Sequence, residues 1–109
     1  KHCIKNTEGW QICSSLQPFC KEVIDKPTFG SQKLGEILKE SDEKEKIEKI
    51  MLVGLCTDIC VISNAMVIKA FLPETPIAVD AACCAGVSPE SHKRAIEAMK
   101  VCQIEIENE

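Results

Sequence analysis

The sequence predicts a three-layer α/β fold with a parallel sheet, and three observations lead to this prediction. Apolar runs at residues 50–53 and 76–80 have the composition of buried strands. A helical pattern lies between the two runs, and another follows the second run. Strands that alternate with helices over short links form parallel βαβ units. At 109 residues, the chain has the size of one domain with one core.

The part of the chain before the first apolar run predicts one helix. Val23-Ile24 is a short extended segment before Lys26-Pro27, where proline disfavours helix in the residue that precedes it. Ser31 can cap a helix over 32–40, in which apolar residues fall on one face. The charged stretch 41–46 is predicted to be a surface connection.

The run at 50–53 is bounded by Gly54 and predicts a strand that is covered on both faces. A helix follows almost at once. Either Thr57 or Asp58 can cap it, and Pro73 ends it.

The second strand is predicted at 76–80, and Ser88-Pro89-Glu90 marks the start of a further helix. Serine caps a helix, proline fits its first position, and an acid is favoured near its positive end. The stretch 101–106 then predicts the last strand.

The composition excludes several classes of protein. The net charge is -4 and the lysines are interleaved with glutamates, so no nucleic-acid partner is expected. No apolar run approaches the ~18 to 20 residues that cross a bilayer, so no membrane partner is expected either. The eight cysteines lack the paired CxxC spacing of structural zinc sites. We expect reduced thiols in a cytoplasmic protein.

Cys60 is the candidate nucleophile. It is predicted in the first turn of a helix that follows a strand, at the sheet edge where ligand sites of α/β proteins gather. Backbone N–H groups and the helix dipole favour a negative charge there, and the same groups can bind an oxyanion. On position alone, a buried and inert cysteine is the more common case. Asp58 is likewise more often a helix cap than an acid or base.

Residues 54–61 read GLCTDICV and resemble the G-x-x-T-D-x-C-V element of nicotinamidases, pyrazinamidases and related isochorismatase-like cysteine hydrolases. Further matches follow the order of that family: HC at 2–3 before TEGW at 7–10, DKPTF at 25–29, and VDA at 79–81 before CCAG at 83–86. The resemblance spans nearly the whole chain. It implies a Rossmann-like fold in which residues 1–109 are the C-terminal part of a single domain that lacks its N-terminal strands.

The resemblance also implies roles for the matching residues. Cys60 attacks an amide carbonyl, and Lys26, which by itself reads as a surface lysine, supports the thiolate. The backbone N–H groups of Cys56 and Cys60 form the oxyanion hole, and a cis bond at Leu55-Cys56 is frequent in the family. The implied reaction is hydrolysis of a small carboxamide such as nicotinamide, through a thioester and with release of ammonia.

His2 matches the metal-ligand histidine of the nicotinamidase branch. The resemblance therefore implies one divalent ion, zinc, manganese or iron, which holds the substrate, and no organic cofactor. A solvent-exposed terminal histidine is the alternative, because a lone imidazole needs further ligands to hold a metal. His92 is assigned no role.

The catalytic aspartate of the family and its Asp-x-His metal residues have no match in this chain, so the general base cannot be named. Two functions stay open: an amidohydrolase, and a non-catalytic module of the same fold that binds a ligand or partner. A redox pair at Cys83-Cys84 is a weaker third, because adjacent strand residues point to opposite faces.

The expected partners are a small amide substrate and further copies of the chain, or else the missing N-terminal part. Without that part a parallel sheet would expose apolar strand edges. We therefore expect that residues 1–109 alone do not melt cooperatively.

Overall fold

The computed structural model describes residues 3–109, so the prediction for His2 lies outside the described residues. Three parallel strands form one sheet in the order β1-β2-β3, with β1 at Ile50–Leu55, β2 at Ile77–Ala85 and β3 at Glu105–Glu107. The predicted parallel α/β sheet is confirmed. The central strand is β2, and β1 lies at one edge.

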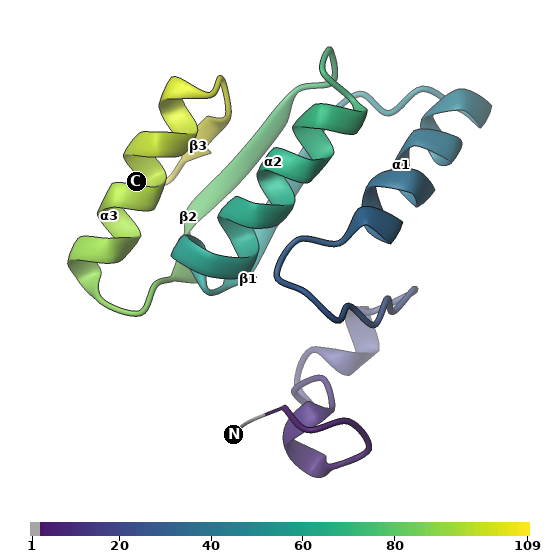
Figure 1. Cartoon of the computed structure of the whole chain (residues 1–109), viewed down its shortest axis with the longest axis vertical. Helices are drawn as coiled ribbons and strands as arrows, with labels where there is room; N and C mark the ends of the chain where they lie inside the picture. Colours follow the sequence, from purple (N-terminus) through teal and green to yellow (C-terminus); the bar gives the residue numbers. More distant parts are fainter. Residues whose placement is uncertain (1–2) are drawn as a thin grey trace.

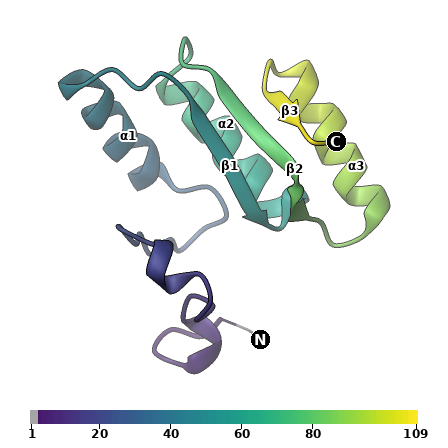
Figure 2. The same ribbon diagram turned by 180° about the vertical axis from the view of Figure 1, so that it is seen from behind.

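Three helices lie on one face of this sheet: α1 at Gln32–Lys44, α2 at Ile62–Phe71 and α3 at Pro89–Val101. Figure 1 shows the helices in front of the strands, and Figure 2 shows the strands from behind. The helices and the sheet thus supply two of the three predicted layers in the described part. Their shared core consists of Val61, Ala65, Ile68, Leu72, Ile77, Val79, Ala81, Ile96, Met99 and Ile104.

The opposite face of β1 is open in the described part of the chain. Met51, Val53 and Leu55 are 42%, 57% and 69% exposed, whereas Ile50 and Leu52 pack against the core. The prediction of a strand covered on both faces is therefore wrong for residues 3–109. Its apolar residues on the open face fit a layer that this part of the chain does not provide.

Helix α1 is longer than predicted, because it continues through most of the stretch expected to be a surface connection. Glutamate and lysine are good helix formers. Lys44 also pairs with Glu40 one turn earlier at 3.5 Å, and Asp42 accepts the backbone N–H of Ile47 at 2.8 Å just beyond the helix. Ser31 caps the other end as predicted, accepting the Leu34 N–H at 3.1 Å.

Strand β2 is also longer than predicted, and an irregularity explains why. Leu52 pairs with Val79, but Gly54 pairs with Cys84, so β2 carries extra residues between these two pairs. Gly54 has φ +124, a conformation that side chains rarely adopt, and glycine meets this requirement. The bulge carries β2 beyond Asp80 to the same sheet edge as the end of β1.

The end of the chain differs from its prediction. Helix α3 begins after the Ser88 cap as predicted, but it runs on to Val101, and β3 contains only Glu105–Glu107. The helix stops where Gln103 takes a positive φ of 65° and the Ile104 N–H bonds to the Met99 carbonyl at 3.0 Å, a common C-terminal arrangement. The predicted strand at 101–106 is thus mostly helix end and turn.

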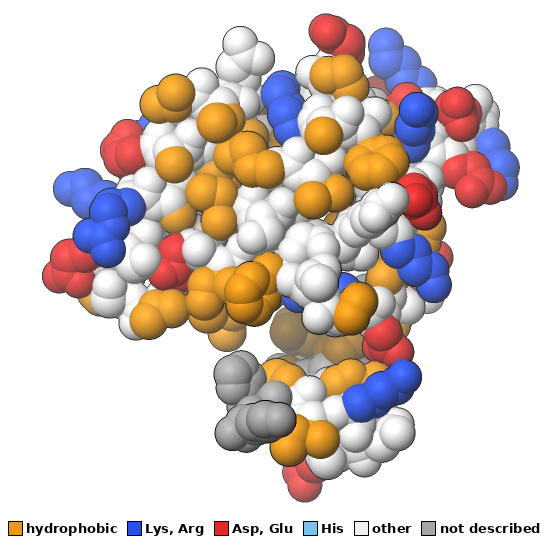
Figure 3. Space-filling model, viewed as in Figure 1, with side chains coloured by type: hydrophobic (Ala, Val, Ile, Leu, Met, Phe, Trp, Pro, Cys, Tyr) orange, Lys and Arg blue, Asp and Glu red, His pale blue; other side chains and the backbone are white. Residues whose placement is uncertain are grey.

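The segment before α1 protrudes from the α/β body, at the bottom of Figures 1 and 3. It contains two short 3-10 turns, Glu8–Trp10 and Gln17–Phe19. Phe19 is 81% exposed and Val23, which lies in no strand, is 61% exposed. Among the described residues, no helix is long and apolar enough to cross a membrane.

Candidate active site

Cys60 lies on a π-helical turn, Thr57–Val61, directly after the carboxyl end of β1. The Val61 N–H donates to the Cys56 carbonyl at 3.0 Å, which closes the wide turn. The peptide bond Leu55-Cys56 is cis, as the family resemblance implied. Wide turns of this kind are frequent at functional sites, and strand ends are where α/β proteins place ligands.

Lys26 reaches Cys60 from a distant part of the chain. Its Nζ lies 3.2 Å from the Cys60 Sγ and also donates to the Thr28 carbonyl at 3.3 Å. An ammonium group at this distance stabilises a thiolate. The two side chains to which the family resemblance gives catalytic roles are therefore in contact.

Asn64 connects the Lys26 segment to the helix that follows Cys60. Its side-chain amide donates to the carbonyls of Phe29 at 3.1 Å and Cys60 at 2.9 Å, and its oxygen accepts the Ser31 N–H at 2.8 Å. Sequence reasoning missed Asn64. The available signal was its position four residues after Cys60, on the same side of a helix.

Thr57 and Asp58 do not cap the helix through their side chains, which corrects that prediction. Fully buried Thr57 instead bonds through Oγ1 to His92 Nδ1 at 2.7 Å, so His92, which was given no role, anchors the turn to α3. Asp58 accepts from the Ser91 hydroxyl and from the Val87 N–H at 3.2 Å. The Ser91 hydrogen bond, with that of Val87, lowers the pKa of Asp58. Both polar side chains thus hold the π turn against the start of α3.

The backbone of Cys56 and Cys60 belongs to this same turn, with Cys56 at its start and Cys60 inside it. That their backbone N–H groups form an oxyanion hole stays a prediction.

The end of β2 carries Cys83 and Cys84 beside Asp80. Asp80, through a hydrogen bond and its negative charge, raises the pKa of the Cys83 thiol. Burial is the main cause that raises the pKa of the Cys84 thiol. A raised pKa disfavours the thiolate at both residues, which argues against a nucleophilic role for either.

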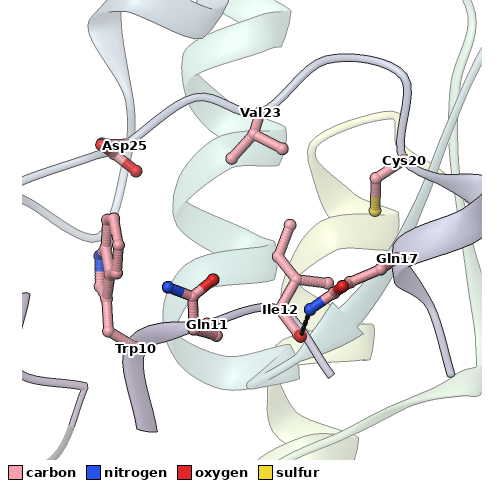
Figure 4. A pocket seen from close by; sticks show the side chains of 7 residues that line it. All are labelled: Trp10, Gln11, Ile12, Gln17, Cys20, Val23 and Asp25. Atoms are coloured by element: carbon pink, nitrogen blue, oxygen red, sulfur yellow. Dashed lines mark hydrogen bonds between the residues drawn. The ribbon is translucent and has the colours of Figure 1, made fainter. Parts of the chain in front are cut away.

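Two adjoining cavities lie in the protruding segment. The smaller, of about 250 Å³, is lined by Trp10, Gln11, Ile12, Gln17, Cys20, Val23 and Asp25, and Figure 4 shows these side chains around it. The larger, of about 670 Å³, shares Trp10 and Asp25 and also has Lys26 in its wall. The lysine that contacts Cys60 therefore also borders an open space of ligand size.

The metal prediction has no support from the described residues. Within residues 3–109, no three His, Cys, Asp or Glu side chains gather as metal ligands. The residues described do not form a site for a divalent ion by themselves, and no chemical step is assigned to one.

A family model of the isochorismatase domain matches residues 1–107. The chain belongs to the isochorismatase family of hydrolases. The match covers the contact between Lys26 and Cys60 and the whole sheet. A comparison with curated proteins found no match.

Solved structures agree with this family. The nicotinamidase/pyrazinamidase of Bacillus subtilis superposes with a TM-score of 0.78 at 25% identity, over 99% of this chain and 62% of that one. The nicotinamidase of Staphylococcus aureus superposes with a TM-score of 0.77 at 26% identity, and the match covers 97% of this chain and 70% of that one. The pyrazinamidase of Pyrococcus horikoshii, solved in complex with zinc, is similar in fold, with a TM-score of 0.74 at 23% identity. That match covers 97% of this chain and 60% of the other. The chain thus spans less than two thirds of the length of the Bacillus subtilis enzyme.

Proposed function

We propose that the protein containing this chain is a cysteine amidohydrolase that converts a small, nicotinamide-like carboxamide into the carboxylic acid and ammonia. The observation that carries this proposal is the 3.2 Å contact between Lys26 Nζ and Cys60 Sγ at the end of β1. Membership of a hydrolase family and the similarity to two nicotinamidases support it.

The proposed reaction has two stages. The Cys60 sulfur bonds to the amide carbonyl carbon, and the resulting oxyanion is held by the N–H groups of Cys56 and Cys60. The C–N bond then breaks, and the nitrogen leaves as ammonia after it gains a proton, which forms a thioester. Water attacks the thioester, the C–S bond breaks, and the thiol is restored. The base that removes the thiol proton is proposed to come from outside these 109 residues.

A divalent ion that holds the substrate is part of the proposal, with His2 as one ligand and the others supplied from outside the chain. The zinc complex of the Pyrococcus horikoshii pyrazinamidase supports this idea. The open face of β1 supports association with an N-terminal part or with another copy, because exposed apolar strands are usually covered.

The test is ammonia release by the full-length protein from nicotinamide, pyrazinamide and a set of aliphatic amides. We expect turnover of at least one of them, with the acid formed in equal amount. Acyl-enzyme trapped by rapid quench should map to the peptide that contains Cys60. Absence of turnover for all the amides, with the metal supplied, would overturn the proposal.

A second candidate is a non-catalytic module that binds a ligand or partner. One observation favours it: within residues 3–109, the hydrogen bonds of Cys60 Sγ include Lys26 but no carboxylate. Alkylation by iodoacetamide separates the two functions. An activated Cys60 reacts well below the pH of about 8.5 at which free cysteine ionises, and an ordinary profile would favour the binding module.

A further inference from the structure

Lys26 lies in an irregular segment, so its long side chain gains no position from a helix or strand. A lysine side chain has four rotatable bonds, and holding its ammonium beside a thiol costs conformational entropy. The Thr28 carbonyl accepts one of its hydrogen bonds, but this carbonyl belongs to the same segment. The contact with Cys60 therefore depends on what fastens the segment to the body of the protein.

The side chain of Asn64 attaches the segment to α2. Its amide spans the gap between α2 and the segment, with two hydrogen bonds to Phe29 and Ser31 and a third to the carbonyl of Cys60 itself. It thus touches the backbone on both sides of the contact between Lys26 and Cys60. It uses donors for the carbonyls and its acceptor for the N–H, so the amide is satisfied on both ends.

The backbone between these hydrogen bonds lies tightly on α2. A Cβ at Gly30 would stand 3.0 Å from Val67 Cγ2 and 3.4 Å from the Ser63 carbonyl. Because even one added carbon atom would be crowded there, the segment has little room to shift along the helix once the Asn64 bonds are made. Ser31 then starts α1, which anchors the far end of the segment.

We propose that Asn64 is a positioning residue that sets the Lys26 ammonium against the Cys60 thiol. It acts through the Phe29–Ser31 backbone and does not contact the thiol. This inference deepens the proposed function and rests on it only for the statement that the Cys60 sulfur attacks an amide. The placement of Lys26 is a separate, measurable property.

The substitutions follow from the three hydrogen bonds. Asn64→Asp keeps the acceptor for Ser31 but turns both donors into an acceptor facing the carbonyls of Phe29 and Cys60. Asn64→Ala removes all three bonds. Asp42→Ala is the matched control, because it removes one side-chain bond to a backbone N–H at the far end of α1.

The measurement is the pH dependence of iodoacetamide alkylation at Cys60 in the full-length protein, followed by peptide mass spectrometry. We expect Asn64→Asp and Asn64→Ala to slow alkylation near neutral pH about three- to tenfold, while the rate at high pH stays the same. In a Lys26→Met background the same substitutions should have no further effect, because the cation they position is gone. Asp42→Ala should leave the profile unchanged.

Two results would overturn the inference. One is an Asn64 variant that melts at a lower temperature but keeps the wild-type alkylation profile. The other is an equal loss with and without Lys26, which would mean that Asn64 acts on Cys60 directly. The alkylation measurement needs no amide turnover. If the protein hydrolyses no amide but the Asn64 variants still shift the alkylation profile, the proposed function is wrong and this inference holds.

Discussion

The ends of β1 and β2 lie side by side at one sheet edge, and each carries two cysteines, but their electrostatic surroundings are opposite. After β1, a lysine ammonium lies 3.2 Å from the Cys60 sulfur. At the end of β2, the Asp80 carboxylate raises the pKa of the neighbouring Cys83 thiol. The same residue type therefore meets a cation in one place and an anion in the other.

This difference teaches that position at a strand end does not by itself select a nucleophile. Both pairs of cysteines occupy the edge where α/β proteins bind ligands. A cation beside a thiol favours the thiolate and a carboxylate disfavours it. Here Lys26 reaches Cys60 from a distant segment, whereas Asp80 lies in the same strand as Cys83. The π turn adds to the difference, because Cys60 lies in a helical turn and Cys83 in a strand.

The largest expected effect is on catalysis, and it distinguishes the cysteine after β1 from the cysteine at the end of β2. Cys60→Ala in the full-length protein should lower amide hydrolysis about 10³-fold or more, because the covalent step is lost. The exposed residue Cys83 is the matched control, and Cys83→Ala should leave the rate close to wild type. Steady-state ammonia release measures both. Equal losses in the two variants would contradict the comparison.

Removing the cation should make the first thiol resemble the second. Lys26→Met should slow alkylation of Cys60 near neutral pH about tenfold, because the adjacent positive charge is lost while the bulk of the side chain is kept. Peptide mapping after iodoacetamide treatment gives the rate for each cysteine. Cys83 and Cys84 serve as internal standards, and their rates should not change.

Removing the anion should do the reverse at the second thiol. Asp80 raises the pKa of Cys83, so Asp80→Asn should lower that pKa and speed alkylation of Cys83 near neutral pH a few-fold. Cys84 should respond less, because burial is the main cause of its raised pKa. The same mapping experiment applies, and a slower reaction at Cys83 would show that the carboxylate has the opposite influence.

The smallest expected effect concerns Asp58, whose hydrogen bonds connect the turn after β1 to the residues that follow β2. The pKa of Asp58 lies below its ordinary value of about 3.9, chiefly through the Ser91 hydrogen bond. Its contribution to stability is therefore complete above that pH and is lost as the pH falls through the native pKa. Asp58→Asn should lower the Tm at neutral pH, and the difference from wild type should shrink as the pH falls below the ordinary pKa of a free aspartate. A constant difference in Tm across this range would mean that the carboxylate charge plays no part.

Local patterns predicted most of the α/β body correctly. The strands at β1 and β2, the Ser31 and Ser88 caps and the start of α3 all appear where the sequence placed them. These features depend on neighbours within about one helical turn or on strand composition, which a sequence displays directly.

The failures have a common physical cause. The end of α3 and the extra length of β2 depend on how each element meets its neighbours, through a left-handed Gln103 and a bulged register with β1. Thr57 and Asp58 were the two alternative helix caps, and the Thr57 side chain instead bonds to His92, 35 residues away. Propensity describes what a residue prefers locally, and tertiary contacts override it.

The sequence by itself determined the order of strands and helices and the place of Cys60 just after a strand, because periodicity and composition act over a few residues. The motif at 54–61 added the family. Only the tertiary structure decided that Cys60 lies beside a lysine ammonium. Lys26 and Cys60 are 34 residues apart, and Asn64 joins Ser31 over 33. Such contacts exist only once the segment before α1 has folded back onto α2.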